Sequence, residues 1–432
     1  MAKRGPFGVL DIGTDKTVCL IARMDGTQAK VMGVGHVKSR GLKAGAVIDM
    51  DACEQSILQA VGAAEAQAGE TLRSVIVSLS GGNPFSRTSV HDIDIGGREV
   101  TDADTRRVVQ ESRRRLGAAP GGHGLGPATG VMGDTASRST ERYVIHTIPV
   151  AFTVDGSRGI RDPREMVAQR LGVHVHVVTA SSSALRNLSA CIARCHLDIQ
   201  DVVASPYAAG LAALDPDQRN LGHVLVDMGG GTTTIAVFSQ GQPIHIDCVP
   251  IGGNHVTSDI ARGLSTSLAH AERIKTLYGA ALAADADERE LIDVPVIGED
   301  HTVQPNHVPK SILTGIIQPR LEETFELVRA KLEQSNFDHQ TWNNVVLTGG
   351  AAQLHSVRDL ARHILDRNVR IGRPQGLAAL PKDLSGPAFA TVAGLIDFAQ
   401  LPSAELLRLG RAKPDAKRSL IGRFGLWFRE NF

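Results

Sequence analysis

Residues 225–234 read LVDMGGGTTT, an apolar run that ends in an acid and is followed by three glycines and three threonines. Three consecutive glycines are entropically expensive to order. A turn of this composition therefore indicates that something must approach the backbone closely. A glycine turn between two strands exposes consecutive backbone N–H groups, which form a concave site for an anion such as phosphate. Threonine hydroxyls add donors, and an acid just before the turn can hold a hydrated Mg²⁺.

A second copy of this pattern lies near the N-terminus, in residues 10–17 (LDIGTDKT). Both copies have the form Asp-apolar-Gly-x-x-x-Thr after an apolar strand. The matching residues are Asp11, Gly13 and Thr17 in the first copy and Asp227, Gly229 and Thr233 in the second. Two copies about half the chain apart predict two related half-domains that face each other and clamp a polyphosphate. The alternative, a pair of ordinary hairpin turns, explains one glycine per turn but neither the repeated acid nor the triple glycine.

A third glycine turn lies in residues 345–354 (VVLTGGAAQL), where a strand runs into Gly349-Gly350 and then a helix. This arrangement suits the close approach of a nucleoside to a helix N-terminus. Taken alone, it is equally compatible with a simple strand-to-helix turn. The P-loop pattern GxxxxGK[ST] does not occur, so a P-loop nucleotide site is excluded.

Composition narrows the class of protein. The chain has 432 residues, 42% of them hydrophobic, with Lys+Arg and Asp+Glu balanced at 46 each. At about 150 residues per domain, this length predicts two to three domains. The charge balance argues against a general nucleic-acid binder. Five scattered cysteines favour a reducing compartment, and their spacing predicts no structural metal. No apolar run resembles a signal peptide or a membrane span, so we expect a cytoplasmic protein.

The motifs and shifts in composition divide the chain into seven segments. The expected segments are a first half with the first phosphate loop (1–83), an inserted α+β subdomain (84–166), a return to the first half (167–200), a second half with a helical subdomain (201–355), closing helices of the first half (356–400), a linker (401–416) and a C-terminal amphipathic helix (417–432). Within the insertion, the Gly-, Ala- and Pro-rich stretch 117–137 is expected to be a disordered loop.

The last segment, KRSLIGRFGLWFRENF, has the pattern of a surface-seeking helix. Leu420, Phe424, Trp427 and Phe428 form an apolar stripe at helical spacing. Arg423 and Arg429 lie off the stripe. Such a helix suits the plane of an anionic membrane surface, where it would fold on contact. The alternatives are docking on its own domain or on a partner protein.

Together these motifs resemble the actin/Hsp70/sugar-kinase superfamily and, within it, the bacterial cell-division FtsA family, along nearly the whole chain. The stretches that carry the resemblance are VLDIGTDKT (9–17), HTIPVAFTVDGSRGIRDP (146–163), SPYAAGLAALDPDQRNLGHVLVDMGGGTTTIAVF (205–238), VPIGGNHVTSDIA (249–261), AERIKTLYG (271–279) and VVLTGGAAQL (345–354). The resemblance implies an α/β, actin-like fold of two related half-domains that face a nucleotide cleft, with the family's own inserted α+β subdomain.

The resemblance also implies that the cleft binds ATP and Mg²⁺, with roles for particular residues. Gly13, Thr14, Asp15 and Lys16 would form the first phosphate loop, and Gly229, Gly230, Gly231, Thr232 and Thr233 the second. Asp11 and Asp227 would lie near Mg²⁺. Gly349, Gly350 and Ala351 would line the adenosine, with Glu272 and Lys275 near base and ribose. For these last two, a solvated helix face is the alternative.

The implied function is that of a division scaffold. Such a protein forms filaments with itself on the cytoplasmic side of the inner membrane, held peripherally by a C-terminal targeting helix. It anchors the FtsZ ring by binding the C-terminal peptide of FtsZ around residues 316–332 (IIQPRLEETFELVRAKL), where Arg320 is a candidate contact or simply a solvated arginine. The inserted subdomain would contact neighbouring protomers or later division proteins.

One departure from related enzymes bears on turnover. Hydrolytic relatives often carry Glu or Gln before the second phosphate loop to orient the attacking water, and here the matching SPYAAG begins with Ser205. Because phosphoryl transfer depends on that positioning, we expect tight ATP binding with slow or negligible hydrolysis. The alternative is a soluble kinase or phosphatase of the same fold, which would need a catalytic carboxylate in the cleft and no C-terminal helix.

Overall fold

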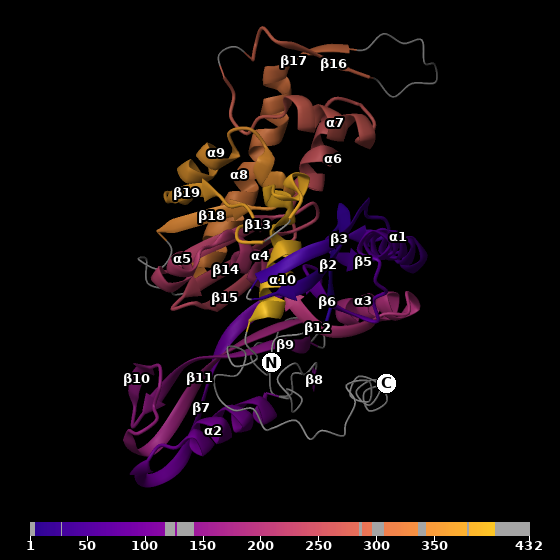
Figure 1. The fold of residues 1–432 in the computed structure, drawn as a ribbon. Coiled ribbons are helices and arrows are strands. Elements are labelled where there is room, and N and C mark those ends of the chain that lie inside the picture. The colour runs from indigo at the N-terminus through magenta and orange to yellow at the C-terminus, as the bar shows by residue number, and fades with distance from the viewer. Residues whose placement is uncertain are drawn as a thin grey trace.

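The computed structural model describes residues 5–26, 28–116, 126–127, 142–284, 287–295, 306–335, 343–377 and 380–401. Two β-sheets with flanking helices occupy the centre and one end of the molecule, and a smaller subdomain forms the other end (Figure 1). The predicted C-terminal helix, nearly all of the predicted linker and nearly all of the predicted loop at 117–137 lie outside the described residues.

The first half is built on a five-stranded sheet of order β12-β6-β1-β2-β3. Its strands are β1 (Phe7–Ile12), β2 (Lys16–Asp25), β3 (Gln28–Lys38), β6 (Ser74–Leu79) and β12 (Asp198–Ala204). The first three form an antiparallel meander, whereas β1, β6 and β12 run parallel. All six residues of β1 are buried, which explains why it reads as a continuous apolar run.

The second half repeats this sheet strand for strand, in the order β15-β14-β13-β18-β19. Its strands are β13 (His223–Met228), β14 (Thr233–Ser239), β15 (Gln242–Val249), β18 (Asn344–Thr348) and β19 (Asn368–Ile371). Antiparallel and parallel pairings occur at the same places as in the first sheet. The two copies of the glycine-turn pattern connect β1 to β2 and β13 to β14. The prediction of two related half-domains is therefore confirmed.

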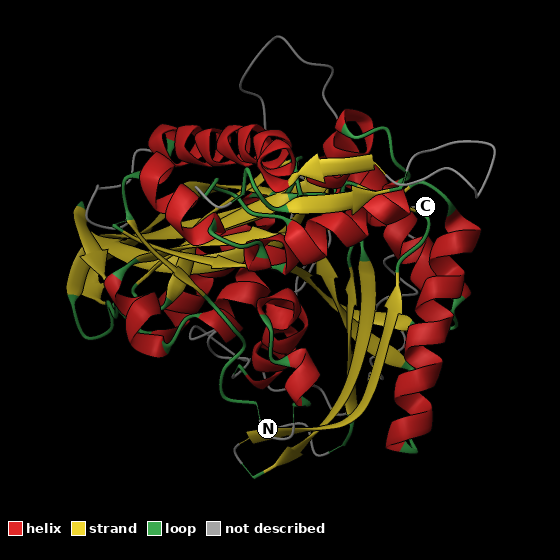
Figure 2. Cartoon of the chain, turned by 90° about the horizontal axis from the view of Figure 1, so that it is seen from above, coloured by secondary structure: helices red, strands yellow, loops and turns green. Residues whose placement is uncertain are grey.

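Helices cover the sheets and differ between the halves. Seen from above, they flank the strands of the twisted sheets (Figure 2). The first half has α1 (Met50–Ala68), α3 (Ser182–Arg194) and a small hairpin of β4 (Leu42–Lys43) and β5 (Ala46–Val47). The second half has α5 (Pro216–Leu221), α6 (Gly253–Gly263), α7 (Leu268–Tyr278), α8 (Lys310–Gln334), α9 (Val357–Leu365) and a hairpin of β16 (Leu291–Val294) and β17 (Asn306–Pro309).

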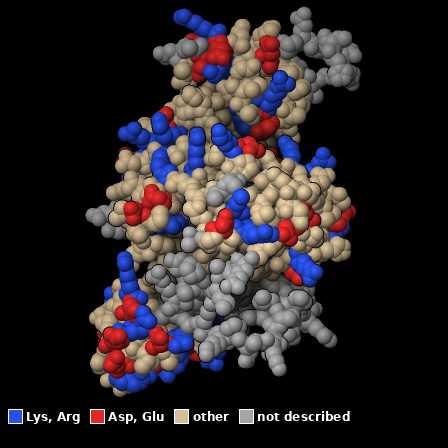
Figure 3. All heavy atoms as spheres, viewed as in Figure 1, with Lys and Arg blue, Asp and Glu red and all other residues tan. Residues whose placement is uncertain are grey.

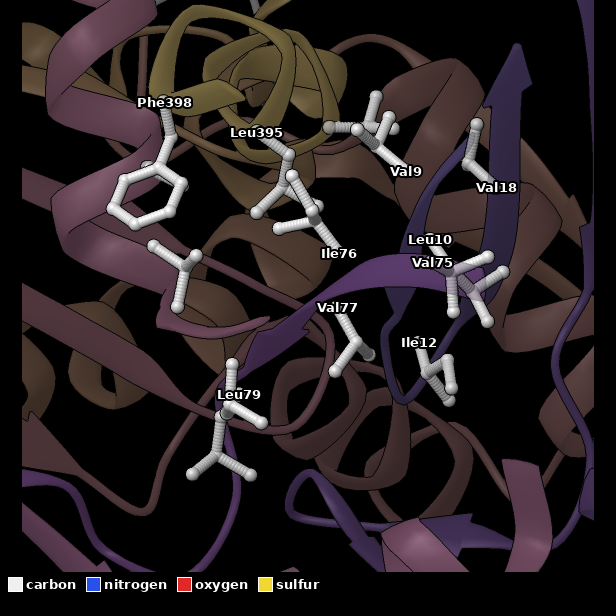
Figure 4. Packing of buried hydrophobic residues seen from close by; sticks show 14 of the residues in the cluster. Val9, Leu10, Ile12, Val18, Val75, Ile76, Val77, Leu79, Leu395 and Phe398 are labelled. Atoms are coloured by element: carbon white, nitrogen blue, oxygen red, sulfur yellow. The ribbon is translucent and has the colours of Figure 1, made fainter. Parts of the chain in front are cut away.

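Two helices lie between the sheets and join the halves: α4 (Ser205–Ala213) and α10 (Ala390–Gln400). Helix α10 packs on β1 and β6, while α4 packs on β13 and β14. Leu395 and Phe398 of α10 belong to the same buried cluster as Val9 and Ile76 of the first sheet (Figure 4). The helices cross so closely that a Cβ on Gly394 would lie 1.7 Å from the carbonyl oxygen of Ala208.

The inserted subdomain has its own sheet, β10-β9-β11-β7, with the short strand β8 against β9. Its elements are β7 (Phe85–Glu99), α2 (Asp102–Arg115), β8 (Gly126–Pro127), β9 (Arg142–Val154), β10 (Ser157–Ile160) and β11 (Val167–Ser181). A capping box between Thr101 and Asp104 begins α2. The subdomain also contacts the second half, because Ser86 Oγ accepts a hydrogen bond from the Ile246 amide at 2.6 Å.

Two expected segment boundaries differ from the structure. Strand β11 pairs with both β7 and β9, so the subdomain extends to Ser181 and not to residue 166. Helix α9 packs in the core of the second half and β19 pairs with β18, so residues 356–371 do not belong to the first half. Both errors have one cause. The local pattern of a segment predicts whether it forms a strand or a helix, but not which distant part of the chain it packs against.

The surface carries both signs of charge. On the face shown in Figure 3, basic and acidic side chains are interspersed over the described parts of both halves and the inserted subdomain. None of the described helices combines the length and hydropathy needed to cross a membrane. The five cysteines are buried and free of disulfides.

The helix crossing yields a stability prediction. Gly394→Ala should lower the melting temperature, because the new Cβ would overlap the Ala208 carbonyl and push α10 from α4. Gly315→Ala is the matched control: Gly315 lies inside α8 with nothing within 4 Å of a new Cβ, so alanine should raise the melting temperature slightly. Thermal unfolding of both variants checks this. Equal melting temperatures for the two variants would contradict the close crossing.

Candidate functional site

A cavity between the two halves collects the ends of both central strands and the starts of both joining helices. Residues from six separate parts of the chain line it. They are Asp11, Gly13, Thr14, Asp15, Lys16, Ser80, Ser205, Asp227, Gly229, Gly230, Gly231, Thr232, Thr234, Gly349, Gly350, Ala388 and Thr391. The structure thus brings together eight of the nine predicted phosphate-loop residues, both predicted acids and two of the predicted adenosine residues. Thr233 lies just behind, with its hydroxyl donating to the Ile251 carbonyl at 2.8 Å.

The two glycine turns have the same geometry. In the first, the amide of Gly13 donates to the carbonyl of Lys16 at 3.0 Å. In the second, the amide of Gly229 donates to the carbonyl of Thr232 at 2.9 Å. A single such bond closes each turn, and the strand register on either side is equivalent. The sequence echo is therefore also an echo in backbone structure.

Close packing explains why the second turn needs three glycines. A Cβ on Gly231 would lie 2.4 Å from Thr14 Oγ1 of the facing turn. A Cβ on Gly230 would lie 3.0 Å from the Cβ of Asp15. Gly229 would bring its Cβ to 3.0 Å from the Thr232 carbonyl oxygen. Gly230 and Gly231 therefore let the two turns approach each other across the cleft, and Gly229 leaves room for the Thr232 carbonyl within its own turn.

Asp11 and Asp227 place two buried carboxyl groups in the cavity. Each is tied down by one hydroxyl: Ser78 donates to Asp11 at 2.6 Å, and Thr391 donates to Asp227 at 3.0 Å. Burial raises the pKa of Asp227 to about 6, with a further contribution from the charge of Asp11. Burial also raises the pKa of Asp11, which nearby Lys16 partly offsets. The protein atoms around the two carboxyl groups thus supply too little positive charge to offset their burial.

These carboxyl groups fit a hydrated Mg²⁺. Mg²⁺ usually takes one or two carboxylates and completes its shell with water and phosphate oxygens. Within the described residues, no group of three or more His, Cys, Asp or Glu side chains is arranged to hold a metal. Two buried acids beside the two glycine turns therefore suit this ion better than a metal that needs a full protein cage.

Helix N-termini and a lysine supply positive potential to the same cavity. Ser205 is the first residue of α4 and Thr391 the second of α10, so both helices begin at the cavity wall. Helix N-termini favour anions through free N–H groups and the helix dipole. The ammonium group of Lys16 lies 5.4 Å from the centre of the Phe389 ring, a cation–π distance.

Of the predicted adenosine residues, Gly349 and Gly350 line the cavity. Gly349 has φ +89, and a Cβ there would lie 2.4 Å from Asp227 Oδ1, so only glycine fits. The side chains of Lys275, Glu272 and Ala351 do not line the cavity. They gather beside it at Gly253, the first residue of α6: Lys275 Nζ donates to the Gly253 carbonyl at 3.1 Å.

Glu272 and Lys275 form a network and not a freely solvated helix face. Lys275 Nζ donates to Glu272 Oε2 at 2.7 Å and to Thr257 Oγ1 at 2.7 Å. The Lys275 side chain is only 14% exposed. Burial acts to raise the pKa of Glu272, but the hydrogen bonds from Lys275 and Thr257 outweigh it and hold that pKa below its usual value. The pair is thus fixed at the cleft's edge.

Arg320 and the membrane residues lie elsewhere. Arg320 does not line the cavity; its guanidinium pairs with Asp259 of α6 at 2.6 Å and with Glu323 of its own helix, α8. This side chain is 29% exposed and joins α8 to α6. The predicted membrane residues, Leu420, Arg423, Phe424, Trp427, Phe428 and Arg429, lie outside the described part of the chain.

Sequence reasoning missed four residues that line the cavity: Ser80, Thr234, Ala388 and Thr391. Thr234 is the third threonine of the motif at 225–234. Only the pairing of β14 with β13, which sets Thr234 opposite Asp227, shows that its side chain faces the cavity. Thr391 lies near the start of a helix that follows Gly386-Pro387, a start signal that says nothing of what the helix faces.

The paired sheets with a glycine turn from each half around one cleft define an actin-like protein. Solved structures with this fold include the PilM-PilN type IV pilus biogenesis complex, with a TM-score of 0.60 and 18% identity, covering 92% of this chain and 100% of that chain. MreB 5 of Spiroplasma citri has a TM-score of 0.52 and 13% identity, covering 92% of this chain and 96% of that one. At such identities the likeness shows the fold alone.

Sequence comparison defines the family. The model described as cell division protein FtsA matches residues 224–394, and the model described as the SHS2 domain inserted in FtsA matches residues 131–179. The cell division protein FtsA of Rhizobium meliloti is 44% identical over 98% of this chain and 94% of its own length. That of Bacillus subtilis is 35% identical over 90% of this chain and 82% of its own. The chain belongs to the FtsA family of cell division proteins.

The raised pKa of Asp227 predicts how stability depends on pH. Below about pH 4 the carboxyl group is protonated in both folded and unfolded chains, and above about pH 6 the folded protein buries a charge. Folding therefore loses roughly 1–3 kcal/mol from this group as pH rises through that window. Asp227→Asn should raise the melting temperature at pH 7.5 and raise it by clearly less at pH 4.5, where only part of the loss has occurred. Asp25→Asn, at an exposed position, is the control. A gain that is the same at both pH values would contradict the assignment.

Proposed function

We propose that this protein is an ATP-binding, actin-like scaffold of cell division. In this proposal it polymerises on the cytoplasmic face of the inner membrane and anchors the FtsZ ring there, recruiting later division proteins. The observation that carries the proposal is the convergence of two equivalent glycine turns and two buried acids on one cavity. The solved structures of MreB 5 of Spiroplasma citri support it, because one is bound to ADP and the other to AMPPNP.

ATP would lie with its phosphates between the two turns. Backbone N–H groups of the turns and the N-termini of α4 and α10 would face the phosphate oxygens. Mg²⁺ would sit near Asp11 and Asp227 and offset phosphate charge, mostly through waters. The adenosine would extend past Gly349 toward Lys275 and Glu272. Ser205 offers a short hydroxyl and not a carboxylate at the start of α4, so we expect slow or negligible hydrolysis.

Membrane binding would come from the C-terminal helix. Burial of its apolar stripe of Leu420, Phe424, Trp427 and Phe428 in the membrane would contribute about 0.8 kcal/mol of binding free energy per CH₂ group. This would give reversible attachment. The arginines would add attraction to anionic lipid. A filament joins many such helices, so polymerisation would turn weak binding by one copy into stable attachment. A soluble kinase or phosphatase is not favoured, because relatives that match nearly the whole chain are named cell division proteins.

A flotation assay tests the membrane scaffold. Full-length protein with MgATP should float with anionic liposomes, because the apolar stripe and arginines are present. A version that stops after Lys413 should stay in solution. Neutral liposomes are the lipid control, and omission of ATP reports whether polymerisation strengthens attachment. Equal behaviour of the two versions would contradict the anchor and favour a docked C-terminal helix.

The proposed link to FtsZ is α8, around residues 316–332, with Arg320 as a contact to its C-terminal peptide. Arg320→Ala should weaken binding of that peptide about tenfold, the usual loss for a charge-assisted hydrogen bond. Asp259→Asn is the matched variant: it breaks the ion pair that holds Arg320 but leaves the arginine. Fluorescence anisotropy with a labelled peptide distinguishes the roles. If both variants weaken binding equally, Arg320 acts through the α6–α8 contact and not by touching the peptide.

A further inference from the structure

Two hydroxyl groups at the cleft have no hydrogen-bond partner among the residues that the structure describes. They are Ser205 Oγ and Thr234 Oγ1. Both residues line the cavity, and they are only 2% and 1% exposed. Two other hydroxyls there have partners: Thr14 Oγ1 accepts from the Gly45 amide at 2.8 Å, and Thr391 donates to Asp227. Among the described residues that line the cavity, Ser205 and Thr234 are the two whose hydroxyl oxygens are buried without a partner.

Folding alone does not explain this pair. A buried hydroxyl without a partner loses its hydrogen bonds to water and gains none in return, so it destabilises the folded chain. Such groups are uncommon in native proteins, and each calls for an explanation. Two of them bordering one cavity indicate that a polar ligand completes them.

Secondary structure places the two hydroxyls beside the acids and a helix N-terminus. Thr234 of β14 is paired directly with Asp227 of β13, so their side chains share one face of the sheet. Ser205 is the first residue of α4, and α4 packs against β14. The hydroxyls thus approach the same region from two elements. The nearby helix N-terminus makes this region favourable for an anion.

The chemistry of the site points to a phosphate oxygen. Hydroxyl groups donate hydrogen bonds to phosphate, and Mg²⁺ near Asp227 would draw the terminal phosphates to the same place. The turn amides would serve phosphates that ATP and ADP share. Two further donors outside the turns therefore fit the phosphate that only the triphosphate carries.

We propose that Ser205 and Thr234 recognise the terminal phosphate of a bound nucleoside triphosphate and make the cleft prefer a triphosphate to a diphosphate. This inference rests on the proposed binding of ATP. It gives the Ser205 hydroxyl a role of its own in binding, in addition to the slow hydrolysis expected because position 205 has no carboxylate. It also explains why a third threonine follows the glycine turn.

Calorimetric titration of the full-length protein with MgATP and MgADP tests the proposal. Ser205→Ala and Thr234→Val should each lower the affinity for MgATP about tenfold and change the affinity for MgADP less than twofold, because one hydrogen bond to a charged oxygen is lost. Thr314→Val is the matched control. Thr314 in α8 also has a buried hydroxyl without a partner in the described structure, but it does not line the cavity. This variant should bind both nucleotides as the wild type does.

Thermal unfolding separates recognition from structure. Without nucleotide, Thr234→Val and Thr314→Val should both melt at or above the wild-type temperature, because each removes an uncompensated hydroxyl. If Thr234→Val melts at a lower temperature than the wild type, a second variant that carries Thr234→Ser and Ser205→Thr keeps both hydroxyls. This variant should prefer MgATP to MgADP as the wild type does. Loss of that preference would overturn the proposal.

The outcomes are distinct. A wild-type protein that binds neither nucleotide refutes the proposed ATP binding itself. A wild-type protein that binds ATP, with variants that lose ATP and ADP affinity equally, overturns the present inference alone and indicates that the hydroxyls hold water or a shared phosphate. Unchanged binding of both nucleotides in both variants also overturns it.

Discussion

The backbone contact between α10 and α4 fixes how the two halves of this protein meet. Gly394 has no room for a side chain against the Ala208 carbonyl, so the backbones of the two helices approach each other closely at this point. Each helix packs on the sheet of one half, and each begins at the cleft. The same crossing therefore joins the cores and directs two helix N-termini at the site.

The cleft itself combines features that protein atoms alone leave uncompensated. Two buried carboxyl groups have raised pKa values, two hydroxyls lack partners in the described structure, and glycines hold two turns against each other. Each feature costs stability. A magnesium-bound polyphosphate would compensate for these features. The ion would neutralise the acids, and the phosphate oxygens would accept hydrogen bonds from the hydroxyls and the turn amides. A site that sacrifices stability in this way is typical of binding function.

Short-range patterns in the sequence predicted the turns but not every partner of each strand. The repeated Asp-x-Gly pattern gave the two halves correctly, because a glycine turn between apolar strands is a local signal. The boundary at residue 166 was wrong because β11 pairs with β7, a strand far away in the sequence. The hairpin of β16 and β17 was missed within a region read as helical. Likewise, the hydrogen bond from Thr391 to Asp227 joins residues 164 positions apart in the sequence, and no local pattern predicts it.

The most direct measurement is a crystal structure of the full-length protein with Mg²⁺ and a non-hydrolysable ATP analogue. We predict that the phosphates lie between the turns at Gly13–Lys16 and Gly229–Thr232, with the ion near Asp11 and Asp227. The adenosine should lie beside Gly349 and Lys275. An analogue bound elsewhere, or phosphates that contact only one of the two turns, would show that the two related halves do not clamp one nucleotide.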